Sequence, residues 1–198
     1  MKILNLVEEK AKKQVISMPN VEDDLTQMSL TELWQLFPIE LVPPCDAWRS
    51  NFEEMREKLS ETLGSFKVHN ISHVGSTALG TIMSKNIVDI LLELAPEEDI
   101  EAVATTLQMV GFLKMSSTPT RISLNYGYTS QGYAEKVYHL HLRYVGDNAE
   151  CRFLAQLRRN PEIAKAYEKL KLTLAQRYRN DRDAYTQGKT EFVEKYSK

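Results

Sequence analysis

The stretch that decides the fold is His73-Val-Gly-Ser-Thr-Ala-Leu-Gly80, followed by Lys85-Asn-Ile-Val-Asp-Ile-Leu-Leu-Glu93. An apolar run ends at Gly75, where a turn of small residues lets backbone amides approach a ligand closely. The second apolar run carries one acid, Asp89, near its centre. Burying a carboxylate inside such a run costs free energy unless it meets a cation, a donor or a cleft. The two segments therefore predict two strands, a small turn between them and an isolated functional acid.

The composition is that of an ordinary globular protein: 198 residues, of which 42% are hydrophobic and 26% charged. This length suffices for one domain with a full core and an appended helical part. A net charge of -2 argues against an extended nucleic-acid-binding surface. Cys45 and Cys151 have neither metal-ligand spacing nor a disulfide framework around them, and no signal peptide or membrane-length apolar run is present. We expect a cytoplasmic protein outside the membrane.

Hydrophobic periodicity predicts an α+β fold, in which strands mix with helices and the C-terminal third is helical. Helices are expected over residues 29–37, 46–63 and 97–110, from Asp147, from Asn160, and over 181–196. Strands are expected over residues 66–74, 87–94, 112–115, 121–126 and 137–145, with a loop over 127–132.

The first of these helices has a clear start signal, because Ser29 is followed three residues later by Glu32. Its apolar stripe is large for so short a helix and must dock on the main domain or on a partner chain. The stripe consists of Leu30, Leu33, Trp34 and Phe37.

Alternation along residues 137–145 places His139, His141 and Arg143 on one strand face, opposite an apolar face. Paired histidines can act as acid and base or ligate a transition metal, and an arginine suits a phosphate group. The competing interpretation is a set of hydrogen-bonded or surface side chains.

Asp89 suits a hard divalent cation such as Mg²⁺, although it could equally pair with a buried lysine, arginine or backbone amide. A second ligand on the same strand face would stand two residues later, where the sequence has Leu91. Glu93 shares the face but lies roughly 13 Å from Asp89 along a strand. The metal site is therefore incomplete on this strand.

Other candidates surround these residues in sequence. The amides and hydroxyls of Gly75-Ser76-Thr77 suit phosphate oxygens, while the simpler interpretation is a polar turn. Lys85 could neutralise phosphate or remain a solvated loop lysine. One face of the last predicted helix is either solvated or a phosphate clamp; it carries Arg182, Tyr185 and Lys189.

Together these residues resemble the signature of the GrpB family, an uncharacterised family (UPF0157) placed by similarity in the polymerase-β-type nucleotidyltransferase superfamily. The resemblance extends from about residue 39 to the end, through motifs that include Pro44-Cys-Asp-Ala-Trp48, Tyr138-His-Leu-His-Leu-Arg143 and Asn160-Pro-Glu-Ile163. It implies a domain over 39–198, with a nucleotidyltransferase-like mixed sheet, flanking helices and a helical C-terminal part. An N-terminal helical extension over 1–38 precedes it.

The resemblance also assigns Asp89 to the first acidic position of the superfamily. In active members that acid pairs with a second acid two residues later to bind Mg²⁺, and Leu91 occupies this place here.

The leading hypothesis is a nucleotidyltransferase-like protein that acts on a nucleotide or another phosphorylated small molecule with Mg²⁺ or Mn²⁺. Asp89 would hold the metal and share catalysis with His139 and His141. Phosphate would be bound by His73, Gly75, Ser76, Thr77, Lys85, Arg143 and Lys189.

Two further hypotheses stay open. Leu91 favours a catalytically degenerate module that binds a nucleotide or another ligand with the same fold. A transition-metal hydrolase would use His73, His139 and His141 instead. The assembly is undecided, and a homodimer is one option.

Overall fold

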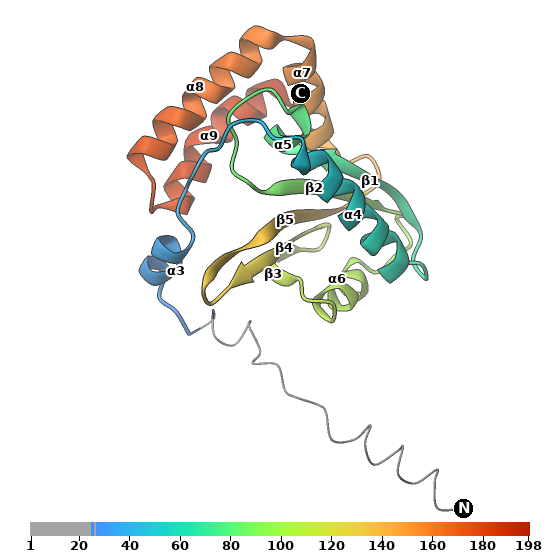
Figure 1. Ribbon diagram of the computed structural model, residues 1–198. Helices are drawn as coiled ribbons and strands as arrows, with labels where there is room; N and C mark the ends of the chain where they lie inside the picture. Colours follow the sequence, from blue (N-terminus) through green and yellow to red (C-terminus); the bar gives the residue numbers. More distant parts are fainter. Residues whose placement is uncertain (1–24, 26) are drawn as a thin grey trace, which may run out of the picture.

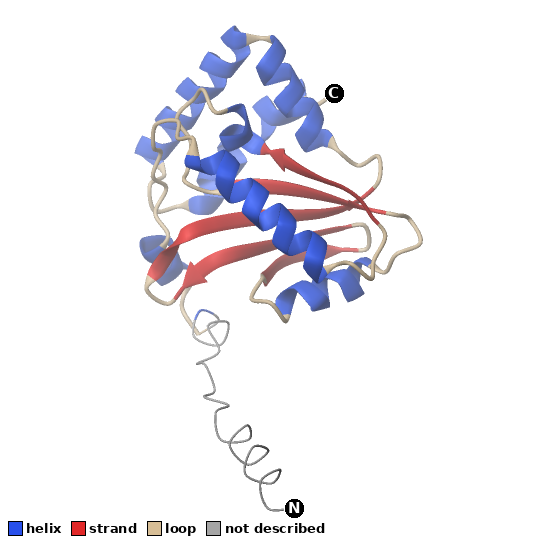
Figure 2. Ribbon diagram, turned by 45° about the vertical axis from the view of Figure 1, so that its right-hand side comes forward, coloured by secondary structure: helices blue, strands red, loops and turns tan. Residues whose placement is uncertain are grey.

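A computed structural model describes residue 25 and residues 27–198 of the chain. These form an α+β fold around one five-stranded mixed sheet with the strand order β1-β2-β5-β4-β3 (Figures 1 and 2). Strands β2 and β5 pair in parallel, and the other neighbours are antiparallel. The strands are β1 Val68–Val74, β2 Val88–Leu94, β3 Leu113–Thr118, β4 Arg121–Thr129 and β5 Gly132–Tyr144. Most of the predicted 1–38 extension lies outside the described residues.

The helices divide between the sides of the sheet. Figure 2 shows α4 crossing one face of the sheet, while α7, α8 and α9 gather beyond the β1 edge in Figure 1. The helices are α3 Leu30–Leu36, α4 Ala47–Thr62, α5 Gly75–Leu79, α6 Ile100–Gln108, α7 Ala149–Arg159, α8 Pro161–Arg177 and α9 Arg182–Tyr196.

The main core lies between the sheet and helices α4 and α6. Strand alternation turns Val88, Ile90 and Leu92 of β2 toward these helices, and all three are buried. Asp89 and Leu91 therefore face the opposite side of the sheet. We call this side the cleft face. Strand alternation decides which of the candidate site residues point to it.

The predicted start of α3 is confirmed. Ser29 accepts a hydrogen bond from the Glu32 amide, and the Glu32 carboxylate accepts one from the Ser29 amide. Phe37, at the end of the helix, is buried with its ring 4.8 Å from that of Tyr128 and 5.0 Å from that of Tyr133. Phe37 and Leu33 of the α3 stripe thus pack with residues of the β4–β5 hairpin of their own chain, whereas Leu30 is 62% exposed and Trp34 is partly exposed.

The predicted loop over 127–132 is wrong, because β4 and β5 continue through it as a hairpin. A bulge between Tyr126 and Tyr128 keeps the strands paired. Gly127 sits there at φ +85°, and a Cβ on it would lie 2.3 Å from the Lys136 carbonyl oxygen. Only a glycine permits this close approach. In the sequence the same glycine resembles a loop residue, and this led to the wrong prediction.

Three local predictions also need correction. Helix α4 begins at Ala47 rather than at the predicted Asp46, whose side chain makes no capping hydrogen bond. Asn148, not Asp147, precedes α7, and Asp147 instead binds Arg121. Gly75, where the sequence predicts a small-residue turn, is instead the first residue of the short helix α5. Among the described residues, no helix is long and apolar enough to cross a membrane.

Candidate functional site

A cleft of about 1050 Å³ opens on the cleft face of the sheet. Strand register brings its walls together, because Asp89 pairs with both Val74 of β1 and His139 of β5. The structure gathers seven of the residues that the sequence singles out along this cleft: Gly75, Ser76, Lys85, Asp89, His139, His141 and Lys189.

Gly75 allows the Asp89 carboxylate to lie directly against the start of α5. The glycine adopts φ +70°, and a Cβ on it would lie only 2.3 Å from Oδ2 of Asp89. Any other residue would therefore displace the carboxylate or strain the backbone. The small-residue turn serves here to make room for the acid.

A chain of hydrogen bonds connects Asp89 to Arg182 through His139. Nδ1 of His139 lies 3.0 Å from Oδ1 of Asp89, and Nε2 lies 3.0 Å from a guanidinium nitrogen of Arg182. A guanidinium can only donate, so Nε2 must accept and Nδ1 must carry the proton. His139 is therefore a neutral imidazole that donates to the Asp89 carboxylate.

The pKa values agree with this assignment. Burial lowers the pKa of His139 to about 4, which leaves the ring neutral near pH 7. Burial opposes ionisation of Asp89, yet the hydrogen bond from His139 and the nearby charge of Lys85 bring its pKa below the usual range. Asp89 is therefore an ionised carboxylate that a neutral histidine orients.

His141 is held less firmly. Its Nε2 lies 4.0 Å from Oδ1 of Asp89, and its Nδ1 is buried without a hydrogen-bond partner in the described part of the chain. Burial lowers the pKa of this ring as well. Arg182 donates a hydrogen bond to His139 but none to His141.

Four cationic side chains surround Asp89: Lys85, Lys171, Lys189 and Arg182. None of them forms an ion pair with a carboxylate among residues 25 and 27–198. Lys85 and Lys189 lie over the Tyr185 ring, 5.9 Å and 4.3 Å from its centroid. The predicted polar face of the last helix is thus turned into the cleft.

Burial and mutual repulsion lower the pKa values of the three lysines. Burial first, and then the charges of Arg182 and Lys189, lowers the pKa of Lys85 well below its ordinary value. Burial likewise lowers the pKa of Lys171 to about 7 and that of Lys189 to about 8. Positive charge is therefore held here at a cost that an anionic ligand would relieve.

Lys171 was missed by the sequence interpretation. It is 2% exposed, and its ammonium donates to the Met83 carbonyl and to Ser84 at 3.2 Å. The signal was its spacing, since Tyr167, Lys171 and Leu174 fall on the buried side of α8. A lysine in an otherwise apolar helix stripe could have marked it.

Two predicted phosphate ligands lie away from the cleft. His73 faces the core side, where its ring stacks on Phe52 at 4.9 Å and its Nε2 lies 3.0 Å from Oγ1 of Thr77. Thr77 is buried in α5 and engaged in that same hydrogen bond. One-residue alternation along β1 accounts for this placement, because Val74 pairs with Asp89 and His73 therefore turns the other way.

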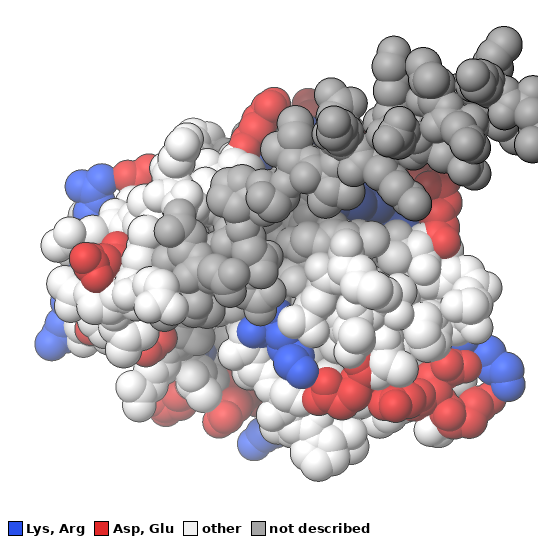
Figure 3. All heavy atoms as spheres, turned by 90° about the horizontal axis from the view of Figure 1, so that it is seen from below, with Lys and Arg blue, Asp and Glu red and all other residues white. Residues whose placement is uncertain are grey.

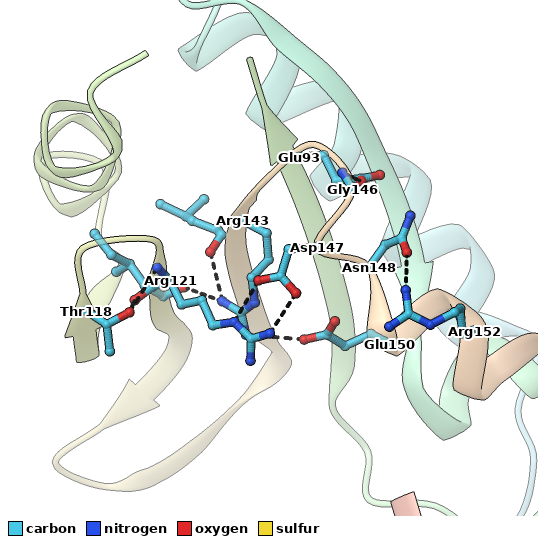
Figure 4. A network of polar contacts seen from close by, with 11 residues as sticks. Glu93, Thr118, Arg121, Arg143, Gly146, Asp147, Asn148, Glu150 and Arg152 are labelled. Atoms are coloured by element: carbon cyan, nitrogen blue, oxygen red, sulfur yellow. Dashed lines mark hydrogen bonds and ion pairs between the residues drawn. The ribbon is translucent and has the colours of Figure 1, made fainter. Parts of the chain in front are cut away.

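Arg143 also lies outside the cleft, although it shares a strand face with His139. Figure 4 shows its guanidinium turned toward Glu150, and the two form an ion pair at 3.2 Å. It further donates to the carbonyls of Ile122 and Leu142. The beginning of α7 covers this end of the strands, and Arg143 is a buried cation bound through both terminal guanidinium nitrogens, while its Nε has no hydrogen-bond partner among the described residues.

The donor set can be compared with the Mg²⁺ or Mn²⁺ that the resemblance implies. Within the described residues, no group of three His, Cys, Asp or Glu side chains could hold a metal ion. Leu91 is fully buried beside Asp89 on the cleft face. The site does not fit a two-ion centre. A single hard ion at Asp89 would have that one carboxylate as its ligand and would need phosphate oxygens and water for the rest of its coordination.

Charge elsewhere is mixed. On the face seen in Figure 3, acidic side chains gather along one side with lysines or arginines beside them. This face thus carries both signs of charge next to each other.

The fold is an α+β architecture around a five-stranded mixed sheet, in which Asp89 and His139 are register partners on parallel strands and His141 lies two residues further along β5. The GrpB family model, described as GrpB protein, matches residues 38–198. The chain therefore belongs to the GrpB family.

Individual relatives agree with this assignment. The chain is 32% identical to UPF0157 protein PA4798 of Pseudomonas aeruginosa, over 78% of this chain and 64% of that protein. It is 31% identical to the Glutamate-rich protein GrpB of Alkalihalophilus pseudofirmus, over 78% and 91% respectively. The first alignment thus spans less than two thirds of the relative's length.

Among solved structures, the conserved protein GrpB from Enterococcus faecalis superposes with a TM-score of 0.64 at 23% identity. It covers 80% of this chain and 100% of that one. This likeness concerns the fold.

Proposed function

We propose that the cleft binds a nucleotide or another phosphorylated small molecule, with its phosphates among Lys85, Lys171, Lys189 and Arg182. The observation that carries this proposal is the group of four cations that have no carboxylate ion-pair partner among the described residues. A phosphate chain supplies the missing negative charge and accepts charge-assisted hydrogen bonds from ammonium and guanidinium groups. Ser76 adds a hydroxyl donor at the cleft wall.

In this proposal Asp89 holds one Mg²⁺ or Mn²⁺ together with the phosphate oxygens. Such an ion, when bound, neutralises phosphate charge and polarises the phosphoryl group. His139 keeps the carboxylate in place through its 3.0 Å hydrogen bond, and Gly75 leaves space for it. His139 is thus a positioning residue, since Arg182 occupies its second nitrogen.

For a transfer reaction, His141 is the candidate general base. It would take the proton of an acceptor hydroxyl as that oxygen bonds to phosphorus and the terminal phosphates leave as pyrophosphate. Lys85 and Lys189 would stabilise the charge that develops on the leaving group.

A second candidate function is binding without turnover. Leu91 favours it, because an apolar side chain fills the place of the second acid. The ligand-binding cations are common to both candidates, and only the transfer chemistry separates them.

Isothermal titration of the full chain with the four common nucleoside triphosphates, with and without Mg²⁺ or Mn²⁺, tests the binding proposal. We expect binding that the divalent ion strengthens, and we expect Asp89→Asn to remove that gain while metal-free binding persists. If no triphosphate binds, or if the metal effect survives in Asp89→Asn, the proposal fails.

Product analysis after incubation separates the two functions. Release of pyrophosphate or phosphate that His141→Gln reduces by about 100-fold, within the usual range for a general base, indicates transfer chemistry. Tight binding with no product from any of the four nucleotides favours the binding module.

A further inference from the structure

Helix α3 forms one wall of the cleft, although it lies before the residues that the family model matches, 38–198. Leu33, Trp34 and Phe37 all line the same cleft as Asp89. Figure 1 shows α3 beside the end of the β4–β5 hairpin. This wall therefore lies outside the part of the chain that the family model matches.

The helix is fixed on the hairpin. The capping box of Ser29 and Glu32 closes its first turn. Its last turn packs against the hairpin turn, where a Cβ on Gly132 would lie 3.5 Å from the Leu36 carbonyl oxygen. Phe37 anchors it between two tyrosine rings. A wall held in this way can present a side chain to a ligand in a defined position.

Trp34 is the side chain so presented. It is partly exposed and lines the cleft. Its indole joins no aromatic pair and no buried cluster in the part of the chain that the structure describes. A large flat surface that borders a cleft without a stacking partner is suited to a planar ligand ring.

Polar groups line the same cleft from β4. The side chains of Asn125 and Ser123 face it, and neither makes a hydrogen bond to a described residue. Asn125 is 6% exposed, so its amide is nearly buried beside His139, its register partner. The nearly buried amide of Asn125 and the half-buried hydroxyl of Ser123 favour a ligand that has polar edges as well as apolar faces.

Tyr128 joins this end of the cleft to the cationic end. Its ring packs on Phe37 at 4.8 Å. Its phenol oxygen lies 2.8 Å from Nε2 of His139 and accepts a hydrogen bond from Arg182. One residue therefore touches both the α3 wall and the proposed phosphate site.

We propose that α3 and β4 form a subsite for a nucleobase, in which Trp34 stacks on the ring while Asn125 and Ser123 hydrogen-bond its edge. This inference rests on the proposed function, because it assigns the other end of the same ligand. It narrows the ligand from any phosphorylated small molecule to a nucleotide. In this subsite α3 supplies the stacking surface, and β4 sets the base preference.

A nucleobase fits these residues better than an acyl chain or a peptide segment. An acyl chain would leave the Asn125 amide and the Ser123 hydroxyl desolvated and without partners, which costs free energy. A base offers donors and acceptors on its edge and two π faces, and stacking on an aromatic side chain tolerates every base.

The test compares a nucleotide with the same phosphates lacking a base. Isothermal titration of the full chain would measure ATP, GTP, CTP, UTP and inorganic tripolyphosphate against the wild type, Trp34→Ala, Trp34→Phe and Gln35→Ala. Gln35 is an exposed neighbour on the same helix and serves as the matched control.

We expect Trp34→Ala to weaken the best-bound nucleotide by about 10-fold, in the range found for loss of one base–aromatic stack. Tripolyphosphate should bind to it as it does to the wild type, Trp34→Phe should restore most of the nucleotide affinity, and Gln35→Ala should change neither. Asn125→Ala should reduce the difference between the best and the worst nucleotide.

The outcomes separate the two proposals. Equal effects of Trp34→Ala on nucleotide and tripolyphosphate, or no effect on either, overturn the base subsite and leave the phosphate site standing. Absence of binding for every ligand in the wild type overturns the proposed function itself. Thermal unfolding of Trp34→Ala near the wild-type midpoint establishes that a loss of affinity is local.

Discussion

An acidic residue of β2 pairs in register with a basic residue of β5 at two places, and the surroundings of the two pairs differ. Asp89 pairs in register with His139, and four residues further along Glu93 pairs with Arg143. At the second place α7 covers the side chains: Arg143 is bound by Glu150 and two carbonyls, and Glu93 accepts from the Gly146 amide (Figure 4).

At the first place, cations accumulate around the acid without ion pairs among the described residues. An acid opposite a basic residue on adjacent strands thus indicates a ligand-binding site only where some of the surrounding charged side chains have no partner of opposite charge. We call the Glu93–Arg143 pair the balanced end and the Asp89–His139 pair the unbalanced end. The balanced end contributes to stability, and the unbalanced end is available for a ligand.

The largest effect should come from breaking the balanced end. Arg143→Met leaves the Glu150 carboxylate without its cation, and removal of one partner of a buried pair typically costs about 3 kcal/mol. We expect urea denaturation to give a free energy of unfolding lower by about that amount, while tripolyphosphate binding persists below the transition. A loss of anion binding with unchanged stability would assign Arg143 to the site after all.

The reverse result is expected at the unbalanced end. Lys189→Met removes a cation that lies over Tyr185 and has no ion-pair partner among the described residues. Tripolyphosphate affinity should fall about 10- to 100-fold, as befits a lost charge-assisted contact. The unfolding midpoint should stay or rise, because a crowded buried charge has gone. Lys165→Met, on the exposed side of α8, is the matched control.

The pH dependence of binding sharpens the comparison further. The pKa of Lys171 is about 7 and that of Lys189 about 8 without ligand. A bound anion favours the charged ammonium and raises both pKa values, so binding takes up protons. Affinity for tripolyphosphate should therefore be highest below about pH 7 and decrease as the pH rises above about 8.

Titration in two buffers of different ionisation enthalpy measures that proton uptake directly. Lys171→Met should show a shallower decrease with pH than the wild type. Affinity that stays constant or rises across this range would mean that the lysines do not meet the anion.

The smallest effect is expected from the histidine on the core face. His73→Ala removes the stacking on Phe52 and the hydrogen bond to Thr77, which together contribute about 1 to 2 kcal/mol of stability. Thermal unfolding should record this loss, and ligand affinity should not change. A clear decrease in affinity, with the fold intact, would place His73 functionally on the cleft side.

Much of the fold followed from periodicity. Alternation in β5 placed His139, His141 and Arg143 on one strand face, and the Ser29–Glu32 spacing correctly marked the start of α3. The hairpin was missed because Gly127 and Gly132 resemble loop residues, whereas their positive φ angles permit a bulge and a tight turn.

The site was predicted less completely, for physical reasons that differ by residue. His73 is one residue out of phase with Asp89, and only the pairing register decides which face each side chain takes. Whether Arg143 is free depends on where α7 lies, and Lys171 reaches the cleft only through the packing of α8 on the loop at Met83. The helical spacing of Lys171 could have marked it as buried, but the local sequence does not show which distant segments these side chains meet.

The most direct measurement is a crystal structure of the full chain soaked with tripolyphosphate. The account predicts phosphate density in the cleft between Arg182 and the ammonium groups of Lys85, Lys171 and Lys189, with Arg143 still bound to Glu150. Phosphate bound elsewhere, or an empty cleft at a concentration that saturates binding in solution, would contradict it.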